Sequence, residues 1–159
     1  MKYEDLVKNT PKVSKATTNN VDQSARVRLN DIVFQKGVRT ETFYLEVGSS
    51  SKGSSYGVMI MFKGIDDYQG LSEEEIAMGL NPKPSLSKND IAVRCNCPSY
   101  RFRFDYANRG AKAATGAKFP AYHKLTDRAP NNPDNIPGVC KHIMEAMDYL
   151  ISNGFVNAW

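Results

Sequence analysis

Two short stretches decide the fold: Val93-Arg94-Cys95-Asn96-Cys97-Pro98 and Gly138-Val139-Cys140-Lys141-His142-Ile143. They contain all 3 cysteines of the chain and one of its 2 histidines. Each stretch offers two metal-binding side chains separated by one residue, and three thiolates with one imidazole complete a tetrahedral set of ligands. The expected ligands of one structural Zn²⁺ ion are Cys95, Cys97, Cys140 and His142.

The flanking sequence predicts that the first pair lies on a strand and the second at the start of a helix. Apolar residues recur at every second position over 91–97, so both thiols leave an extended strand from the same face. After Cys140, apolar residues follow helical spacing as far as Ile151, and Gly154 is a stop signal. Residues two apart in a helix point about 200° away from each other. Cys140 should therefore lie at or just before the first turn, and His142 just inside it.

Other interpretations of these residues remain open. Free cysteine is often a small buried hydrophobic residue, and three cysteines with one histidine could instead hold an iron–sulfur cluster. The spare histidine, His123, could replace His142 as a ligand. The doubled one-residue spacing favours a single ion without an open coordination position, and hence a structural role over a catalytic one.

The pattern Cys95-x-Cys97, a gap of 42 residues and Cys140-x-His142 resembles the SWIM-type zinc finger, C-x-C…C-x-H. Pro98, Tyr100 and the apolar helix after the last ligand also fit that family, and the likeness covers about residues 88–152, although the gap is much longer than usual there. The resemblance implies a ββα zinc module that binds DNA or protein. Small proteins with this pattern and a long insertion also resemble tailed-bacteriophage components, which implies a role in virion assembly.

The rest of the chain predicts one α+β domain over residues 25–159, with an antiparallel sheet of three to five strands. Besides 91–97, strands are expected at 27–34, 40–47 and 55–62, the last two forming a hairpin with a mobile tip at 48–54. Residues 1–24 are polar and lack regular periodicity, so we expect a flexible N-terminal arm that docks on a partner.

A short helix is expected at Leu71–Gly79. Ser72 can cap its N-terminus and Glu75, three residues later, can close a capping box, while Gly79 ends the helix. Glutamates in the first turn suit the helix dipole, which favours a structural role for them over a carboxylate active site.

The segment between the two ligand pairs, residues 98–139, is a long basic insert. Its seven basic residues are Arg101, Arg103, Arg109, Lys112, Lys118, Lys124 and Arg128, and its three acidic residues are Asp105, Asp127 and Asp134, which leaves +4, the net charge of the whole chain. Aromatic residues alternate with other residues over 100–106. If that stretch is extended, the aromatic rings share one face and pack beside the zinc, while the arginines face solvent, phosphate or an acidic protein.

These features favour a non-catalytic, zinc-stabilised module that binds other proteins or a second copy of itself through the arm and the basic insert. The alternative is a sequence-tolerant DNA-binding protein. Its phosphate contacts would come from Arg101, Arg103, Arg109, Lys112 and Lys118. No nucleophile–base set remains once the cysteines bind metal, so we expect neither an enzyme nor a small-molecule substrate; a metal-dependent hydrolase would need an open coordination position.

Composition supports one globular domain. The chain has 159 residues, of which 41% are hydrophobic and 24% charged. The longest apolar run, around Val58–Phe62, is far shorter than the roughly 20 residues needed to cross a bilayer. Since Met1–Asp5 has no apolar stretch like that of a signal peptide, we expect a cytoplasmic protein, in the host cell and virion if phage-encoded. Thiols in that compartment stay reduced and bind metal rather than form disulfides.

Overall fold

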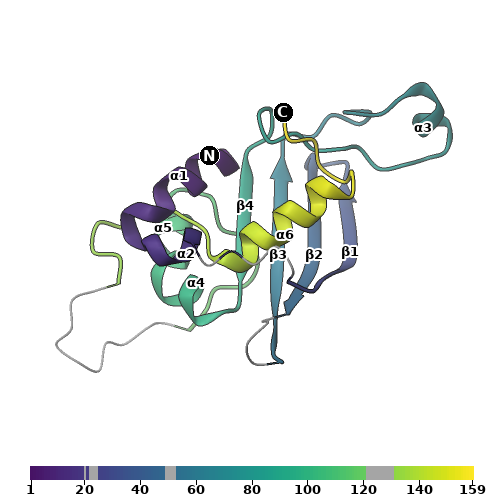
Figure 1. The fold of residues 1–159 in the computed structure, drawn as a ribbon. Coiled ribbons are helices and arrows are strands. Elements are labelled where there is room, and N and C mark those ends of the chain that lie inside the picture. Colours follow the sequence, from purple (N-terminus) through teal and green to yellow (C-terminus); the bar gives the residue numbers. More distant parts are fainter. Residues whose placement is uncertain (20, 22–24, 49–52, 121–130) are drawn as a thin grey trace.

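A four-stranded antiparallel sheet forms the centre of the computed structural model, which describes residues 1–19, 21, 25–48, 53–120 and 131–159 (Figure 1). The strands follow chain order across the sheet: β1 (Val27–Gln35), β2 (Thr40–Gly48), β3 (Ser55–Lys63) and β4 (Ile91–Cys95). The predicted α+β class, the hairpin and the four strands are confirmed, while the hairpin tip at 49–52 lies outside the described residues.

The register of the sheet places the thiol of Cys95, the first candidate ligand, on the face that lines the core. Leu45 of β2 lies opposite Val58 of β3, and Val58 lies opposite Cys95 of β4. Because side chains alternate between the faces of a strand, these directly paired residues share one face. All three are buried. Cys95 therefore ends a row of apolar side chains that crosses the sheet.

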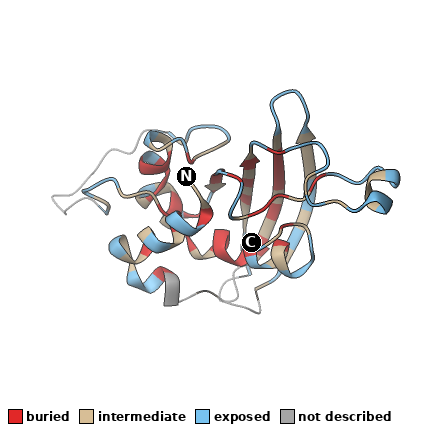
Figure 2. Cartoon of the chain, turned by 90° about the horizontal axis from the view of Figure 1, so that it is seen from above, coloured by how far each residue is buried: buried red, intermediate tan, exposed pale blue. Residues whose placement is uncertain are grey.

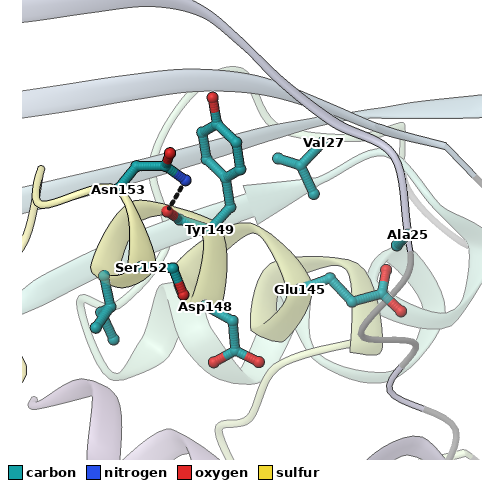
Figure 3. A pocket seen from close by; sticks show the side chains of 8 residues that line it. Ala25, Val27, Glu145, Asp148, Tyr149, Ser152 and Asn153 are labelled. Atoms are coloured by element: carbon teal, nitrogen blue, oxygen red, sulfur yellow. Dashed lines mark hydrogen bonds between the residues drawn. The ribbon is translucent and has the colours of Figure 1, made fainter.

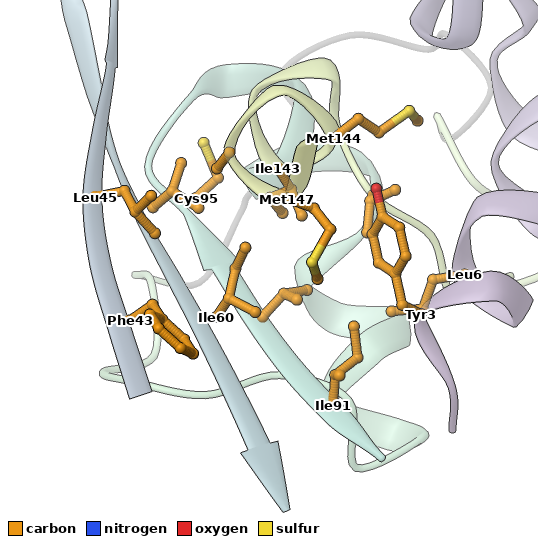
Figure 4. Close-up of a cluster of buried hydrophobic side chains, with 14 of the residues drawn as sticks. Tyr3, Leu6, Phe43, Leu45, Ile60, Ile91, Cys95, Ile143, Met144 and Met147 are labelled. Carbon is orange, nitrogen blue, oxygen red and sulfur yellow. The ribbon is translucent and has the colours of Figure 1, made fainter. Parts of the chain in front are cut away.

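The helix α6 covers that face of the sheet (Figure 1). The helices of the described residues are α1 (Tyr3–Val13), α2 (Lys15–Asn19), α3 (Glu73–Ala77), α4 (Pro98–Arg103), α5 (Asp105–Gly110) and α6 (Lys141–Ser152). Ile143, Met147 and Leu150 of α6 recur at helical spacing and are fully buried. They meet the apolar row of the sheet in one core, shown in Figure 4.

The N-terminal segment differs from the expected flexible arm. Residues 3–13 form α1, whose Tyr3 and Leu6 are buried in the core (Figure 4) and whose Thr10 is also buried. The expectation of an unstructured arm is therefore wrong for these residues. Its three buried positions follow the i, i+3, i+7 spacing of a helix. A threonine occupies the third position, so the apolar stripe is too short to stand out in a polar sequence.

The aromatic stretch 100–106 is helical, so the expectation of one extended aromatic face is wrong. Pro98 begins α4, and the sulfur of Cys97 accepts a hydrogen bond from the Tyr100 amide at 3.4 Å. Proline fits the first position of a helix, since its missing N–H needs no partner there. At helical spacing Tyr100 and Phe104 are buried, whereas Phe102 and Tyr106 are 38% and 79% exposed.

The chain leaves the sheet between β3 and β4 in an excursion over residues 64–90 that carries α3 far from the other helices (Figure 1). The predicted capping box of α3 is confirmed, because Ser72 and Glu75 exchange both hydrogen bonds. Buried Asn89 closes the base of the excursion by donating to the carbonyls of Lys63 and Gly64, each at 3.1 Å. Figure 2 shows that α3 and the chain on either side of it are exposed or half-buried.

Candidate metal centre

Four metal-binding side chains meet where β4, α4 and α6 converge. They are Cys95 at the end of β4, Cys97 as the residue before α4, Cys140 as the residue before α6, and His142 in the first turn of α6. Their ligand atoms all lie within 4.8 Å of one another, and all four residues are buried. Ligand atoms around one tetrahedral zinc ion lie roughly 3.5–4 Å apart, so the cluster can hold one metal ion.

The imidazole of His142 is held against the sulfurs by a neighbouring ring. Its Nδ1 lies 4.0 Å from the Cys95 sulfur, and its plane tilts by 41° on the Tyr56 ring with centroids 4.7 Å apart. The other ring nitrogen, Nε2, is buried and has no hydrogen-bond partner among the described residues. Buried polar nitrogens are nearly always paired. Because Nδ1 is the nitrogen near the Cys95 sulfur, it is the candidate ligand atom, and the unpaired Nε2 is an exception to this rule.

The thiols of the cluster differ in acidity. Burial raises the pKa of Cys95 and Cys140. Hydrogen bonds from the Cys140 and Cys95 thiols lower the pKa of Cys97, and the Tyr100 amide lowers it further. The charge of a bound Zn²⁺ ion would stabilise the thiolate form of all three cysteines. All three cysteines are free of disulfides, as expected.

Buried polar side chains fix the segment that leads into Cys140. Asn108 of α5 donates to the carbonyl of Gly138 and accepts from its amide, both at 2.9 Å. The hydroxyl of Thr10 in α1 accepts from the amide of Val139 at 3.0 Å. Sequence reasoning missed Asn108 and Thr10, since their partners are backbone groups remote in the chain. They position the second ligand pair, and nothing in the sequence around them marks that role.

The structure brings together only part of the predicted basic set. Arg101, Arg109 and Lys118 line one hollow beside α4 and α5. Arg103 instead lies near the metal cluster, with its Nη1 3.2 Å from the Ser99 hydroxyl. Lys112 lies in the turn after α5. His123, Lys124 and Arg128 lie outside the described residues.

A separate hollow of about 530 Å³ follows α6 on the side of β1 (Figure 3). Its lining includes Ala25, Val27, Asp148 and Tyr149, and burial raises the pKa of Asp148. It contains none of the predicted site residues. In the part of the chain that the structure describes, the cluster of three cysteines and one histidine is the one group of at least three metal-binding side chains found so close together.

No model of a known protein family, no curated protein and no solved structure matches this chain. The resemblance to the SWIM-type zinc finger therefore rests on the ligand pattern itself. Among the described helices, none combines the length and apolar character needed to cross a membrane.

Proposed function

We propose that this chain is a zinc-stabilised structural module that binds other proteins and catalyses no reaction. The observation that carries the proposal is the arrangement of four buried protein ligands on three separate elements, β4, α4 and α6. An ion held there joins the sheet to the terminal helix and closes the insert of residues 98–139. The binding energy of such an ion becomes folding energy, because its ligands are not organised in the unfolded chain.

The ligand set favours structure over catalysis. Catalytic zinc sites commonly use three protein ligands and keep a fourth position for water or substrate. Here four protein ligands complete the tetrahedron, and Cys95, Cys97 and Cys140 are at most 1% exposed. His142 is also the sole histidine among the described residues, so it cannot serve both as a ligand and as a general base.

A surface suited to protein contact lies on the β1–β2 turn and the excursion, away from the candidate metal centre. It consists of exposed large apolar residues of the β1–β2 turn and the excursion, and we name it the excursion surface. Its members are Val38, Tyr68, Met78 and Leu80, each at least 47% exposed. An ion pair of 2.6 Å between Arg39 and Asp66 joins the turn to the excursion. Exposed large apolar side chains on two joined segments favour a protein-binding role.

The test of the metal centre is a measurement of zinc in the full chain after purification without chelator. We expect about one zinc per chain, as for a single tetrahedral site. Replacement of zinc by Co²⁺ should give the intense visible bands of a tetrahedral thiolate complex. Added azide should leave that spectrum unchanged, since no coordination position is open. A spectrum that responds to azide would reject the structural assignment in favour of an open, catalytic site.

The test of protein binding uses the excursion surface. We expect sedimentation equilibrium to show association of the wild-type protein, and the double variant Tyr68→Ser, Met78→Ser to be shifted towards the monomer. Tyr106→Ser, an equally exposed change on the other side of the molecule, is the control. A wild-type monomer at all concentrations would exclude a homo-oligomer; a photoreactive residue in place of Met78 then identifies the partner protein. In its more specific form, the proposal is that this module binds other proteins during assembly of a phage virion.

The DNA-binding alternative has less support. Duplex binding gains affinity when many cations face the phosphates together, yet Arg103 and Lys112 do not line the hollow that the other three predicted residues share. Duplex affinity that falls steeply with salt, and that weakens in Arg103→Ala and Lys112→Ala, would restore this alternative.

A further inference from the structure

The hollow beside α4 and α5 has the size of a small-molecule site. Its volume is about 880 Å³, and ligand pockets commonly occupy 300–1,000 Å³, as a rough guide. Its wall includes Arg101, Phe102, Asp105, Tyr106, Arg109 and Lys118. None of these residues belongs to the metal cluster or to the excursion surface, so the hollow is a separate feature of the insert.

Two buried polar atoms of this wall have no hydrogen-bond partner among the described residues. Asp105 is 7% exposed, and its Oδ2 accepts from the Arg109 Nε at 3.1 Å while its Oδ1 remains unpaired. The Nε of Arg101 is likewise buried without a hydrogen-bond partner. A lone acceptor and a lone donor four residues apart on one wall are suited to a ligand that offers a donor and an acceptor side by side. The edges of nucleobases carry such pairs, and a carboxylate accepts from their amino groups.

Aromatic rings and cations complete the wall. Tyr106 is 79% exposed, so its ring presents a face on which a flat base can stack. The guanidinium of Arg101 lies 5.1 Å from the centre of the Phe102 ring and 5.6 Å from that of the Phe119 ring. The guanidinium of Arg109 is paired with Asp105 and donates to the carbonyls of Gly116 and Ala117, and exposed Lys118 adds positive charge to the wall. Rings, cations and unpaired polar atoms together match the parts of a nucleotide.

We propose that this hollow binds one nucleotide, with the base on the Tyr106 ring and its polar edge towards Asp105 and Arg101. The phosphate then lies near Arg109 and Lys118. The nucleotide belongs either to a single-stranded nucleic acid or to a free mononucleotide, and the two share this chemistry. A base paired in a duplex cannot enter, since its edge and faces are already occupied. The site is independent of the proposed protein-binding role.

The experiment is a fluorescence anisotropy titration of the zinc-replete full chain with a short single-stranded oligonucleotide, at about 50 mM and 150 mM salt. A duplex of the same sequence and a mixture of unlabelled mononucleotides serve as competitors. Tyr106→Ala should weaken binding roughly fivefold or more, as the loss of one stacking contact does. Lys118→Ala should reduce the dependence of affinity on salt by about one phosphate contact. Tyr68→Ala, which removes an exposed tyrosine of the excursion surface, is the matched control and should bind like the wild type.

Each outcome of this titration either identifies the kind of ligand or overturns the proposal. Binding to the single strand that Tyr106→Ala weakens and that mononucleotides compete for poorly assigns the site to a strand. Mononucleotides that compete as well as the strand assign it to the free nucleotide. The proposal is overturned if neither ligand binds at millimolar concentration, if Tyr106→Ala and Tyr68→Ala bind alike, or if the duplex competes as well as the single strand. Because Tyr106 and Lys118 are exposed, their loss should not prevent folding.

Discussion

The sheet and the insert are held together by different forces. In the sheet, Phe43 and Phe62 meet edge to face with ring centroids 6.0 Å apart, within an apolar core shared with α6 (Figure 4). In the insert, the backbone before Cys140 is held by hydrogen bonds to buried Asn108 of α5 and to buried Thr10 of α1. The metal cluster lies at the boundary between the two regions.

The insert is more sensitive than the sheet to the loss of a single contact. Apolar packing is spread over many contacts of about 0.1–0.2 kcal/mol per atom pair, so the sheet tolerates the loss of any one of them. The insert also packs Tyr100 and Phe104 into this core, but it depends in addition on a few directional contacts and on the candidate metal centre, and each buried polar group left without its partner costs about 1–3 kcal/mol. Loss of a single contact should therefore be severe in the insert and mild in the sheet. It should also be mild in the excursion, because α3 has no buried residue.

Removal of the metal should have the largest effect. We expect Cys140→Ser, or a chelator, to lower the free energy of unfolding by at least about 3 kcal/mol, because the ion's binding energy contributes to folding. Hydrogen exchange should show protection lost first in α4, α5 and residues 131–140, with β2 and β3 protected longer. A chelator added to Cys140→Ser should cause no further loss. Simultaneous loss in the sheet and the insert would show that the two regions form one cooperative unit.

Crowding at Gly138 should have the next largest effect. A Cβ at this position would lie 2.5 Å from Cε1 of Phe104 and 2.9 Å from Oγ1 of Thr10, both buried. We expect Gly138→Ala to cost about 2–3 kcal/mol, since overpacked cores must shift rings or backbone. The control is Gly110→Ala in the same region, where a Cβ meets nothing within 4 Å. Urea unfolding measures both, and equal stabilities would refute the close packing before Cys140.

A buried carboxyl should make the sheet sensitive to pH. Glu41 of β2 lies opposite Phe62 of β3 and is 2% exposed, and burial raises its pKa to about 8. The unfolded chain ionises this group near its ordinary value of 4.5. Its contribution to stability is thus fully present below pH 4.5 and is lost as pH rises through about 8.

Glu41→Gln keeps the shape and removes the titration. The free energy of unfolding of the wild type should fall relative to the variant between about pH 4.5 and 8, by an amount on the order of 2 kcal/mol. Urea unfolding of both proteins at several pH values in that range measures the difference in their free energies of unfolding. The titration of the cysteines cancels from this difference, because both proteins contain them. A constant difference at all pH values would mean that Glu41 is solvated in the folded protein.

Much of the sheet and the metal cluster could be predicted from the sequence, for a physical reason. Strand periodicity of two and helical periodicity of 3.6 are local, so β2, β3 and α6 are visible in their own residues. The ligands were predictable because 42 intervening residues do not disturb the spacing within each pair. The position of Cys140 just before α6 followed from helix geometry and is confirmed.

The insert and the N-terminal segment could not be predicted in the same way. Helix α1 is stable because Leu6 and Thr10 find partners remote in the chain, and α4 begins because Cys97 caps it. Such tertiary contacts decide the structure of short polar segments, whose own propensity is weak. The conformation at Tyr100–Tyr106 likewise followed from its cap rather than from its alternating aromatic residues.

The smallest effect should come from the cap of α3, on the excursion. Ser72→Ala removes the hydroxyl that accepts from the Glu75 amide at 3.2 Å, and loss of such a cap costs about 0.5–2 kcal/mol, at the lower end for an exposed helix. Since α3 has no buried residue, we expect faster hydrogen exchange over residues 73–78 and almost no change in thermal stability. Zinc content and the protection of α4 and α5 should stay at wild-type values. A change in either would couple the excursion to the metal centre, and the division between a directional, metal-held insert and an independently supported excursion would have to be abandoned.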